Sequence, residues 1–456
     1  MRTASPIYRH SSAFTRPLFL RVARLAVAAA AVMTAACAEA PSSPENNESA
    51  SRNAPPDAAT VSSAARLRRY TITDLGTLGG PFSIAYDLTN AGRVIGTAAV
   101  PDGYHHPVYW ENGVIHDVGT LGGPNAEAAG RSTGGQLAIL SETTAPDPLG
   151  ENFCGFGTGL VCAAVTSSNG ALTRLPTLGG TNAAAFQNNS AGTIVGVAED
   201  GVADASCIPP QKTHFQAVIW DGGTIHELPP LHGDEVGAAL RINDRGQAVG
   251  TSGPCSATSY GGFVLGPHAV LWDHGKPIDL GSVGDGSVAV AADVNNRGTV
   301  IGSASFADGS QHPFLWTRDG GIRDLGLMSA DPTDIVNTAF EINDRGQMVG
   351  ASCDVTMQIC RGYIWQNGVM TDVNELLPPD SPLYVILATA INDAGQIAGL
   401  AIDFGTGEAH AFLATPAAGS VAQLATQRLS SPRARPQLLE GMVRKALRQR
   451  FAQRLR

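Results

Sequence analysis

The sequence predicts an all-β fold made of seven similar repeats. All five tryptophans close the same short apolar segment, as in His106–Trp110, His268–Trp272 and His312–Trp316. A turn-ending glycine marks each repeat at spacings of 43 to 57 residues, at Gly92, Gly135, Gly192, Gly246, Gly298, Gly346 and Gly395. The chain also has 53 glycines, as expected for short strands joined by tight turns. Four-strand repeats of this length are typical of propeller blades, so we expect a seven-bladed β-propeller.

The clearest repeat shows its four strands directly. Residues 339–343, 347–350, 362–365 and 369–373 are short, bounded by Gly or Asn, and apolar or alternating, as buried strands are. The turn Asn343–Gly346 between the first two strands fits a type I turn followed by a left-handed glycine. We therefore interpret these recurrent turn residues as architectural.

The two ends of the repeat region predict how it closes. The last repeat reaches its third strand at residues 410–413 and then meets Pro416, with no fourth strand. The region begins with an unpaired strand at residues 70–75. Pairing of these two segments would complete the seventh blade and leave no open sheet edge. The predicted propeller domain is thus 70–415.

Several motifs resemble those of the HAF-repeat family of bacterial extracellular proteins. They are Asp74–Gly80, Asp117–Gly123, the Ile-Asn-Asp turns and His410–Phe412. The resemblance covers residues 70–415 and is weakest in the second repeat, which has Thr166 at the tryptophan position. It implies an exported repeat protein and supplies no catalytic residues.

The N-terminal region predicts export. Residues 1–36 contain five arginines and no acid, and end in an apolar stretch too short to span a bilayer. Residues 34–37 resemble a lipobox that would acylate Cys37, and plain signal-peptidase cleavage is the alternative. Residues 37–69 have the composition of a disordered tether. We expect an outer-membrane lipoprotein, or a periplasmic or extracellular protein.

The C-terminal region, 416–456, is basic. Leu439, Val443, Leu447, Phe451 and Leu455 recur at steps of four among arginines, which predicts an amphipathic helix. This helix would lie on an anionic membrane or dock on the acidic propeller, unless it is a solvated tail. The net charge of −10 conceals a still more acidic middle region, which argues against nucleic acid binding. A monomer is expected.

Six cysteines follow Cys37, and all fall in loops between the second and third strands of a repeat. An even number in an exported chain predicts disulfides. The topology favours Cys154 with Cys162, Cys207 with Cys255, and Cys353 with Cys360. A metal site is the alternative, although the chain has no Cys-x-x-Cys spacing.

Repeated His and Asp residues are expected to make structural hydrogen bonds, because equivalent positions in different blades lie far apart. The acids that do not repeat lie on the loop face, and we take them as candidate ligand residues: Glu142, Asp147, Glu199, Asp200, Asp234, Glu235, Asp331 and Asp334. Carboxylates there could bind Ca²⁺ or, in pairs, hydrolyse glycosides. No cofactor is predicted, and Ca²⁺ is the one ion considered.

The sequence thus predicts an exported, non-catalytic binding or scaffolding module for an extracellular glycan, protein or other ligand. The ligand would lie on the cysteine-loop face near the axis, where the first strands offer Ala85, Ala185, Ala239, Ala291, Ala339 and Ala390. The alternative is a propeller hydrolase or lyase that acts on polysaccharide through the loop acids. No nucleophile elbow, P-loop or zinc-protease motif is present in the sequence.

Overall fold

The computed structural model describes residues 68–130, 135–168, 170–261, 264–284, 286–328, 334–355 and 359–421. All of them belong to the unit Val61–Arg456, the second of two compact units. The predicted export signal, Cys37, almost all of the tether, the basic helix and Asp331 lie outside the described residues. In these ranges no helix combines the length and apolar character that a membrane crossing requires.

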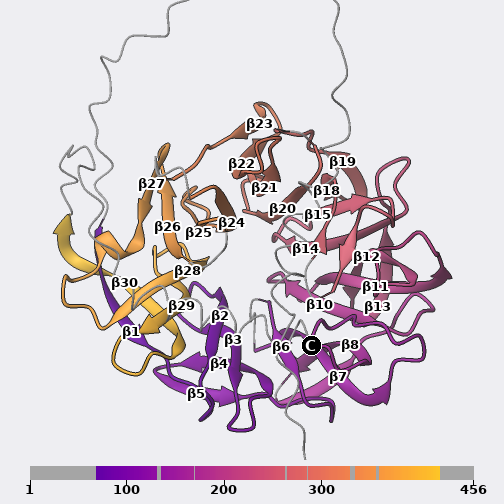
Figure 1. Ribbon diagram of the computed structural model, residues 1–456, viewed down its shortest axis with the longest axis horizontal. Helices are drawn as coiled ribbons and strands as arrows, with labels where there is room; N and C mark the ends of the chain where they lie inside the picture. Colours follow the sequence, from indigo (N-terminus) through magenta and orange to yellow (C-terminus); the bar gives the residue numbers. More distant parts are fainter. Residues whose placement is uncertain are drawn as a thin grey trace, which may run out of the picture. The chain divides into compact units, whose positions relative to one another are not determined.

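The described chain is an all-β fold of successive four-stranded antiparallel sheets arranged as in a β-propeller (Figure 1). The first three sheets follow the chain in simple order: β2 (Ser83–Leu88), β3 (Val94–Ala99), β4 (His105–Glu111) and β5 (Val114–Asp117); β6 (Ala126–Ala128), β7 (Leu137–Pro146), β8 (Leu160–Ser168) and β9 (Ala171–Arg174); β10 (Ala183–Asn188), β11 (Ile194–Ala203), β12 (Thr213–Asp221) and β13 (Thr224–Leu228).

The next sheets keep this order, with one short hairpin inserted. They are β14 (Val236–Ile242), β15 (Ala248–Gly253), β18 (His268–Asp273) and β19 (Lys276–Asp279); β20 (Ala289–Val294), β21 (Val300–Ser305), β22 (Gln311–Thr317) and β23 (Gly321–Asp324); β24 (Val336–Ile342), β25 (Met348–Cys353), β26 (Cys360–Gln366) and β27 (Val369–Asp372). The hairpin pairs β16 (Ser259–Tyr260) with β17 (Val264–Leu265). A single parallel bridge, Gln311 to Val336, joins the β20–β23 and β24–β27 groups into one eight-stranded sheet.

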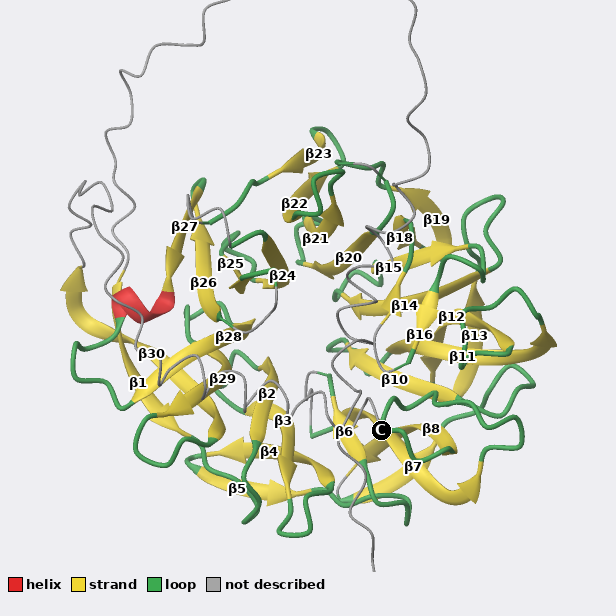
Figure 2. Ribbon diagram, in the orientation of Figure 1, coloured by secondary structure: helices red, strands yellow, loops and turns green. Residues whose placement is uncertain are grey.

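The last sheet takes strands from both ends of the described chain, in the order β1-β30-β29-β28. Its strands are β1 (Arg68–Asp74), β28 (Leu383–Ile391), β29 (Ile397–Asp403) and β30 (Ala409–Val421). Between β27 and β28 lies a single turn of 3₁₀ helix, η1 (Val373–Leu376), the red segment in Figure 2.

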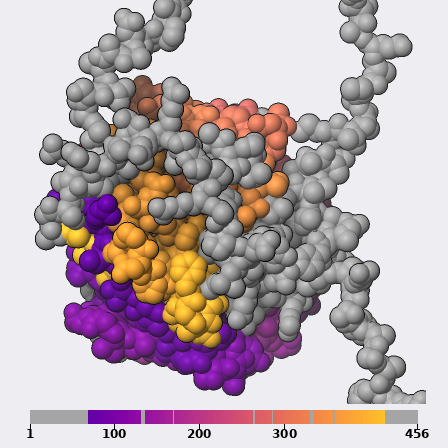
Figure 3. Space-filling view, turned by 60° about the vertical axis from the view of Figure 1, so that its left-hand side comes forward, coloured from indigo at the N-terminus to yellow at the C-terminus, as the bar shows by residue number. Residues whose placement is uncertain are grey.

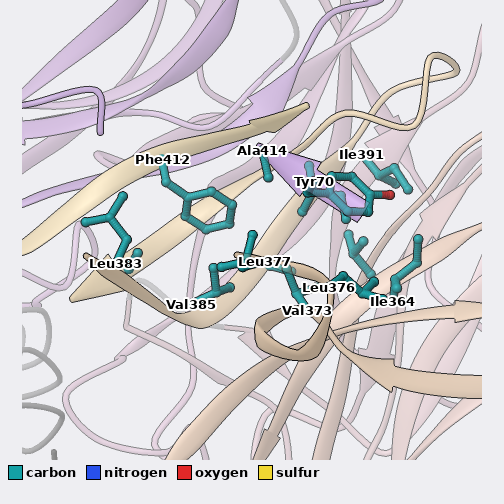
Figure 4. Close-up of a cluster of buried hydrophobic side chains, with 14 residues drawn as sticks. Tyr70, Ile364, Val373, Leu376, Leu377, Leu383, Val385, Ile391, Phe412 and Ala414 are labelled. Carbon is teal, nitrogen blue, oxygen red and sulfur yellow. The ribbon is translucent and has the colours of Figure 1, made fainter. Parts of the chain in front are cut away.

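The expected pairing of the N-terminal strand with the last repeat is present. Ile72 lies opposite Ala414, and Asp74 lies opposite Phe412. The Tyr70 side chain is 4% exposed and packs in a cluster with Phe412 and Ala414 (Figure 4). In Figure 3 the indigo surface of the first strands lies directly beside the yellow surface of the last ones.

Strand β30 continues beyond the predicted domain end at residue 415, through Pro416 to Val421. Its pairing with β29 ends at Ala414, so Pro416 faces a neighbouring strand only on the β1 side. The missing proline N–H therefore disturbs one ladder at most, as at the edge of a sheet.

The first and last sheets of the chain also contact each other. Phe82 forms a parallel bridge with Ala409, and the backbone N–H of Ala411 donates to Ser83 Oγ at 2.9 Å. The hydroxyl of Thr389 donates to the carbonyl oxygen of Ala85 at 2.7 Å. Strands more than 300 residues apart in sequence are thus joined by direct hydrogen bonds.

The tryptophans pack between successive sheets. Trp110, Trp220 and Trp272 are at most 2% exposed. Their Nε1 groups donate to carbonyl oxygens in the segments that lead into their own sheets, at Leu75 (2.8 Å), Pro176 (2.9 Å) and Pro229 (2.7 Å). A buried indole needs such an acceptor, which explains why this residue recurs at this position.

A second recurrent glycine allows close contact between the first two strands of a sheet. In β2, β10, β14, β20 and β24 the pairing shifts by one residue, as at a β-bulge, beside a glycine of the next strand. A Cβ added there would lie 2.0 to 2.1 Å from a first-strand carbonyl oxygen, at Gly96, Gly196, Gly250, Gly302 and Gly350. These glycines are required by space, since their backbone conformation is ordinary.

We predict that Gly302→Ala destabilises the fold, because the new methyl would meet Val290 O at 2.1 Å and Phe314 Cζ at 2.4 Å. Overpacking of this kind costs about 1–3 kcal/mol or more. The matched control is Gly261→Ala, whose Cβ would have nothing within 4 Å. Urea unfolding should show a lower midpoint for the first variant only, and equal midpoints would contradict the close packing.

Candidate functional site

The turns between the first and second strands of the sheets converge around a cavity of about 200 Å³. Six of these turns line it, from the β2, β10, β14, β20, β24 and β28 hairpins. The corresponding turn of the β6 hairpin, residues 131–134, lies outside the described residues. The cavity is therefore built from the repeat's own turns.

In five of the six turns, the first residue is an asparagine that is bonded to the next described turn around the cavity. The Nδ2 groups donate to backbone carbonyl oxygens, in the order Asn189 to Asn243 (3.2 Å), Asn243 to Asn295 (2.9 Å), Asn295 to Asn343 (3.1 Å), Asn343 to Asn392 (2.9 Å) and Asn392 to Thr89 (3.1 Å). The last of these bonds returns from the final sheet to the first. A continuous series of side-chain bonds thus holds the cavity rim.

The second residue of each turn repeats this linkage at the cavity mouth. Backbone N–H groups donate to side-chain oxygens of the next turn, in the order Ser190 to Asp244 (2.8 Å), Asp244 to Asn296 (2.8 Å), Asn296 to Asp344 (2.7 Å), Asp344 to Asp393 (2.9 Å) and Asp393 to Asn90 (2.9 Å). Asp and Asn serve equally here, because each has a side-chain oxygen that can accept this bond. The Asp positions add negative charge without altering the bond.

The cavity lining is acidic. Asp244, Asp293, Asp344 and Asp393 are among its residues, and none of the described lining residues is Lys, Arg or His. Deeper in the lining, the Asp293 carboxylate accepts from the backbone N–H of Ile342 at 2.9 Å, while Gln187 Oε1 accepts from that of Ile242 at 2.8 Å. Such a site attracts cations and repels anions.

The opposite, loop-bearing face differs from the expectation of an alanine-lined ligand mouth. Ala85, Ala185, Ala239, Ala291, Ala339 and Ala390 are all at most 1% exposed. Aromatic side chains from a loop and from strands pack around Tyr260 of β16: the Phe153 and Tyr260 ring centroids lie 4.2 Å apart, and Phe186 of β10 and Phe215 of β12 also contact Tyr260. The sequence argument for the variable face missed the cavity, because the residues lining it recur and so looked purely architectural.

The three predicted disulfides are all present: Cys154–Cys162, Cys207–Cys255 and Cys353–Cys360. The first and third each close one loop, and the second joins the loops of neighbouring sheets. Asp204 and His214 lie beside Cys207 and Cys255, with one ligand atom of each residue within 4.8 Å of the others. Both sulfurs are engaged in the disulfide, and His214 Nε2 instead lies 3.0 Å from Asp204 Oδ2.

Most of the candidate loop acids are buried or hold neighbouring groups in place. Glu142, Asp147, Glu199 and Asp334 are buried, at 8% exposure or less. The amide of Asn182 joins Asp147 to Glu199, at 2.8 and 3.1 Å. Burial raises the pKa of Glu142, although hydrogen bonds from Thr158 and Asn125 oppose this effect.

The remaining acids of this set bind side-chain or backbone groups near them. Gln216 donates to Asp200 at 3.1 Å, His268 Nδ1 lies 2.8 Å from Asp234, and the backbone N–H of Cys255 donates to Glu235 at 2.9 Å. Asp334 forms an ion pair with Arg361. These acids are therefore dispersed over several sheets.

One acid outside the candidate set belongs to the buried group. Glu151 is 1% exposed and lies beside Glu199. Burial, followed by the charge of Glu199, raises the pKa of Glu151 to about 7. This contact could not be predicted from the sequence, because it depends on the path of the loop between β7 and β8.

The recurrent histidines make the structural contacts that the sequence predicts. His106, His312 and His410 lie 2.9, 3.1 and 2.8 Å from Asp117, Asp324 and Asp74. In each case the histidine is on the third strand and the aspartate ends the neighbouring fourth strand. The His410–Asp74 contact therefore joins β30 to β1.

Comparison with known proteins gives structural likeness alone. No family model matches the chain, and no curated protein matches it. The β-propeller domain of the trilobed protease from Pyrococcus furiosus has a TM-score of 0.45 at 12% identity, covering 75% of this chain and 96% of that one. A puromycin hydrolase has a TM-score of 0.43 at 12% identity, covering 76% of this chain and 55% of that one.

A gluconolactonase from Xanthomonas campestris gives a TM-score of 0.35 at 10% identity, over 77% of this chain and 92% of that one. The function proposed below rests on the residues of this chain.

We predict that His410 makes stability depend on pH. Its hydrogen bond to Asp74 raises the pKa of His410, although burial opposes the shift. Burial alone would raise the pKa of Asp74, but the bonds from His410 and Gly76 hold it below its ordinary value. The histidine's contribution is complete below pH about 6.5 and is lost as pH rises through its raised pKa. The aspartate's contribution is lost in acid, as pH falls through its lowered pKa.

The variant His410→Gln should therefore lose about 1 kcal/mol relative to wild type near pH 6, and less at pH 9. Urea unfolding across this pH range measures the difference. His226→Gln, at an exposed position, is the matched control. A loss that stays constant from pH 6 to 9 would show that the ion pair contributes nothing.

Proposed function

We propose that this protein is an exported, non-catalytic β-propeller that binds a positively charged ligand group in the cavity at its turn face. In this proposal the propeller has seven blades, and β1 closes the ring by completing the last one. The ligand group is an amine or guanidinium carried by an extracellular partner. The observation that carries the proposal is the acidic lining of the cavity.

The size and charge of the cavity favour a small cationic group. A volume of about 200 Å³ accommodates a single side-chain-sized group. Four aspartates line the cavity, and the described part of the lining holds no basic side chain that would neutralise them. Charge of one sign in a concave site raises the local concentration of ions of opposite sign. Backbone oxygens and asparagine side chains at the rim would add hydrogen-bond acceptors for an N–H donor.

The rim is also suited to binding because it is already ordered. Neighbouring turns are joined by two hydrogen bonds, one from an asparagine side chain and one to an Asp or Asn side chain, as between the turns at 343 and 392. The turns therefore lose little conformational freedom when a ligand binds. The same bonds argue for binding rather than chemistry, because the Asp side chains are engaged as acceptors of backbone N–H groups.

Seven blades and ring closure are supported by the contacts between the ends of the chain. Strands β1 and β30 pair in register, and Asn392 and Asp393 bond to Thr89 and Asn90. Export is supported by the three disulfides, which form and persist in oxidising compartments. The acylation of Cys37 stays a prediction of the sequence.

The polysaccharide hydrolase or lyase alternative gains no support from the loop acids. In the part of the chain that the structure describes, those on the loop face are buried, or are bonded to histidine, amide or backbone groups of their own region. A glycosidase pair would need two carboxylates facing an open groove.

The experiment titrates the purified protein with N-acetyl-arginine amide and 1,4-diaminobutane, using N-acetyl-citrulline amide as the neutral control. We predict binding of the two cations that weakens as salt is raised, and no binding of N-acetyl-citrulline amide. A lysine-rich peptide that binds more tightly than either small cation would point to a protein partner.

The matched variant is Asp344→Asn, which recreates the Asn-Asn-Arg-Gly turn that the chain already has at Asn295–Gly298. It keeps the rim bond while removing one charge, and we predict about threefold to tenfold weaker binding. Asp380→Asn, at an exposed position outside the cavity, is the control. Equal affinity of wild type and Asp344→Asn for the cations would place their binding outside this cavity.

A further inference from the structure

Three buried carboxylates meet where the loop after β7 crosses the neighbouring sheet. Asp147 and Glu151 come from this loop, and Glu199 comes from β11. Their exposures are 8%, 1% and 1%. The side chain of Asn182 lies between them and donates to both Asp147 and Glu199. Three acids from two sheets thus share one buried space.

One oxygen in this space has no hydrogen-bond partner. Glu151 Oε1 accepts from the backbone N–H groups of Lys212 and Thr213, at 2.5 and 3.1 Å. Glu151 Oε2 is fully buried and has none. The adjacent carboxylate is that of Glu199, which is itself only an acceptor when ionised. Two facing carboxylates cannot satisfy each other without a proton or a cation between them.

No basic side chain neutralises the three acids. Among the described residues, no Lys or Arg side chain lies within ion-pair distance of Asp147, Glu151 or Glu199. The nearby Lys212 directs its Nζ to the carbonyl oxygen of Leu149 instead. Asp147 and Glu199 instead accept bonds from backbone and amide N–H groups. Glu151 Oε2 is the oxygen left over, and a positive species beside it would satisfy it.

A single shared proton would leave two of the three charges buried. A divalent cation offsets two, and the donors available are all oxygens, which is the ligand chemistry that Ca²⁺ prefers. We propose that Glu151 and Glu199 bind one calcium ion, with Asp147 supplying further negative charge across Asn182. The ion would fix the β7–β8 loop to the sheet that contains β11.

This ion would also order the loops around it. The same loop holds the Cys154–Cys162 disulfide and Phe153, which packs on Tyr260 from the loop after β15. Gln211 donates to Glu199 at 3.1 Å and lies in the loop that holds Cys207. Calcium would therefore stabilise the loop-bearing face, and the cavity at the turn face does not depend on it.

The experiment uses the full exported chain after dialysis against a chelator, titrated with CaCl₂ at pH 7.5. We expect one Ca²⁺ per chain, and a rise in melting temperature of roughly 3–6 °C at about 100 times the dissociation constant.

Glu151→Gln and Glu199→Gln should each weaken Ca²⁺ binding at least tenfold, while the exposed Glu227→Gln should bind as wild type does. Wild-type protein that binds no Ca²⁺ at millimolar concentrations would overturn the proposal, and so would unchanged binding in both variants. A melting temperature that falls between pH 6 and 8 without any response to Ca²⁺ would assign the pair to a shared proton instead. The proposed function is tested separately, by the binding of amines at the turn face.

Discussion

The pairing of β1 with β30 is the interaction on which the rest of the structure depends. It places the first described strand of the chain at the outer edge of the last sheet, in register from Tyr70 to Asp74. A linear series of sheets would leave that edge open and the cluster around Tyr70 exposed to water. With the two ends of the chain held together, Phe82 can bridge to Ala409 and the turn of β28 can bond to that of β2.

The turn contacts are the second consequence of that arrangement. The Asn and Asp side chains of the described turns bond to backbone groups of neighbouring turns, so that a repeated local sequence becomes a hydrogen-bonded series along the rim. Because Asp and Asn accept the same bond, the chain can vary the charge of the rim without changing its shape. Aspartates at 244, 344 and 393 make this surface acidic.

The sequence allowed much of this fold to be predicted, since the determinants are local and repeated. The four strands of the repeat at 339–373 are present with ends shifted by up to three residues, and the pairing of residues 70–75 with the last repeat is confirmed. The three cystine pairs follow from loop topology. By contrast, β30 runs past Pro416, because that residue has a single neighbouring strand there.

The candidate site was less predictable for a physical reason. Turn formation alone accounts for a turn residue that recurs in every repeat. That the same residue also lines a cavity becomes visible only in the folded chain, where six turns lie around one cavity. The contact of Glu151 with Glu199 depends on loop conformation, on which strand periodicity has no bearing. Candidate ligand acids such as Glu142 and Asp147 are buried because the loops fold back over the sheets.

The most direct test of this account is hydrogen exchange on two shortened forms of the chain, one beginning at residue 68 and the other at residue 76. Only the first retains β1. The account predicts that the form beginning at 76 loses amide protection in β28 to β30 and in β2, while the form beginning at 68 keeps it. Equal protection in the two forms would contradict the role assigned to β1.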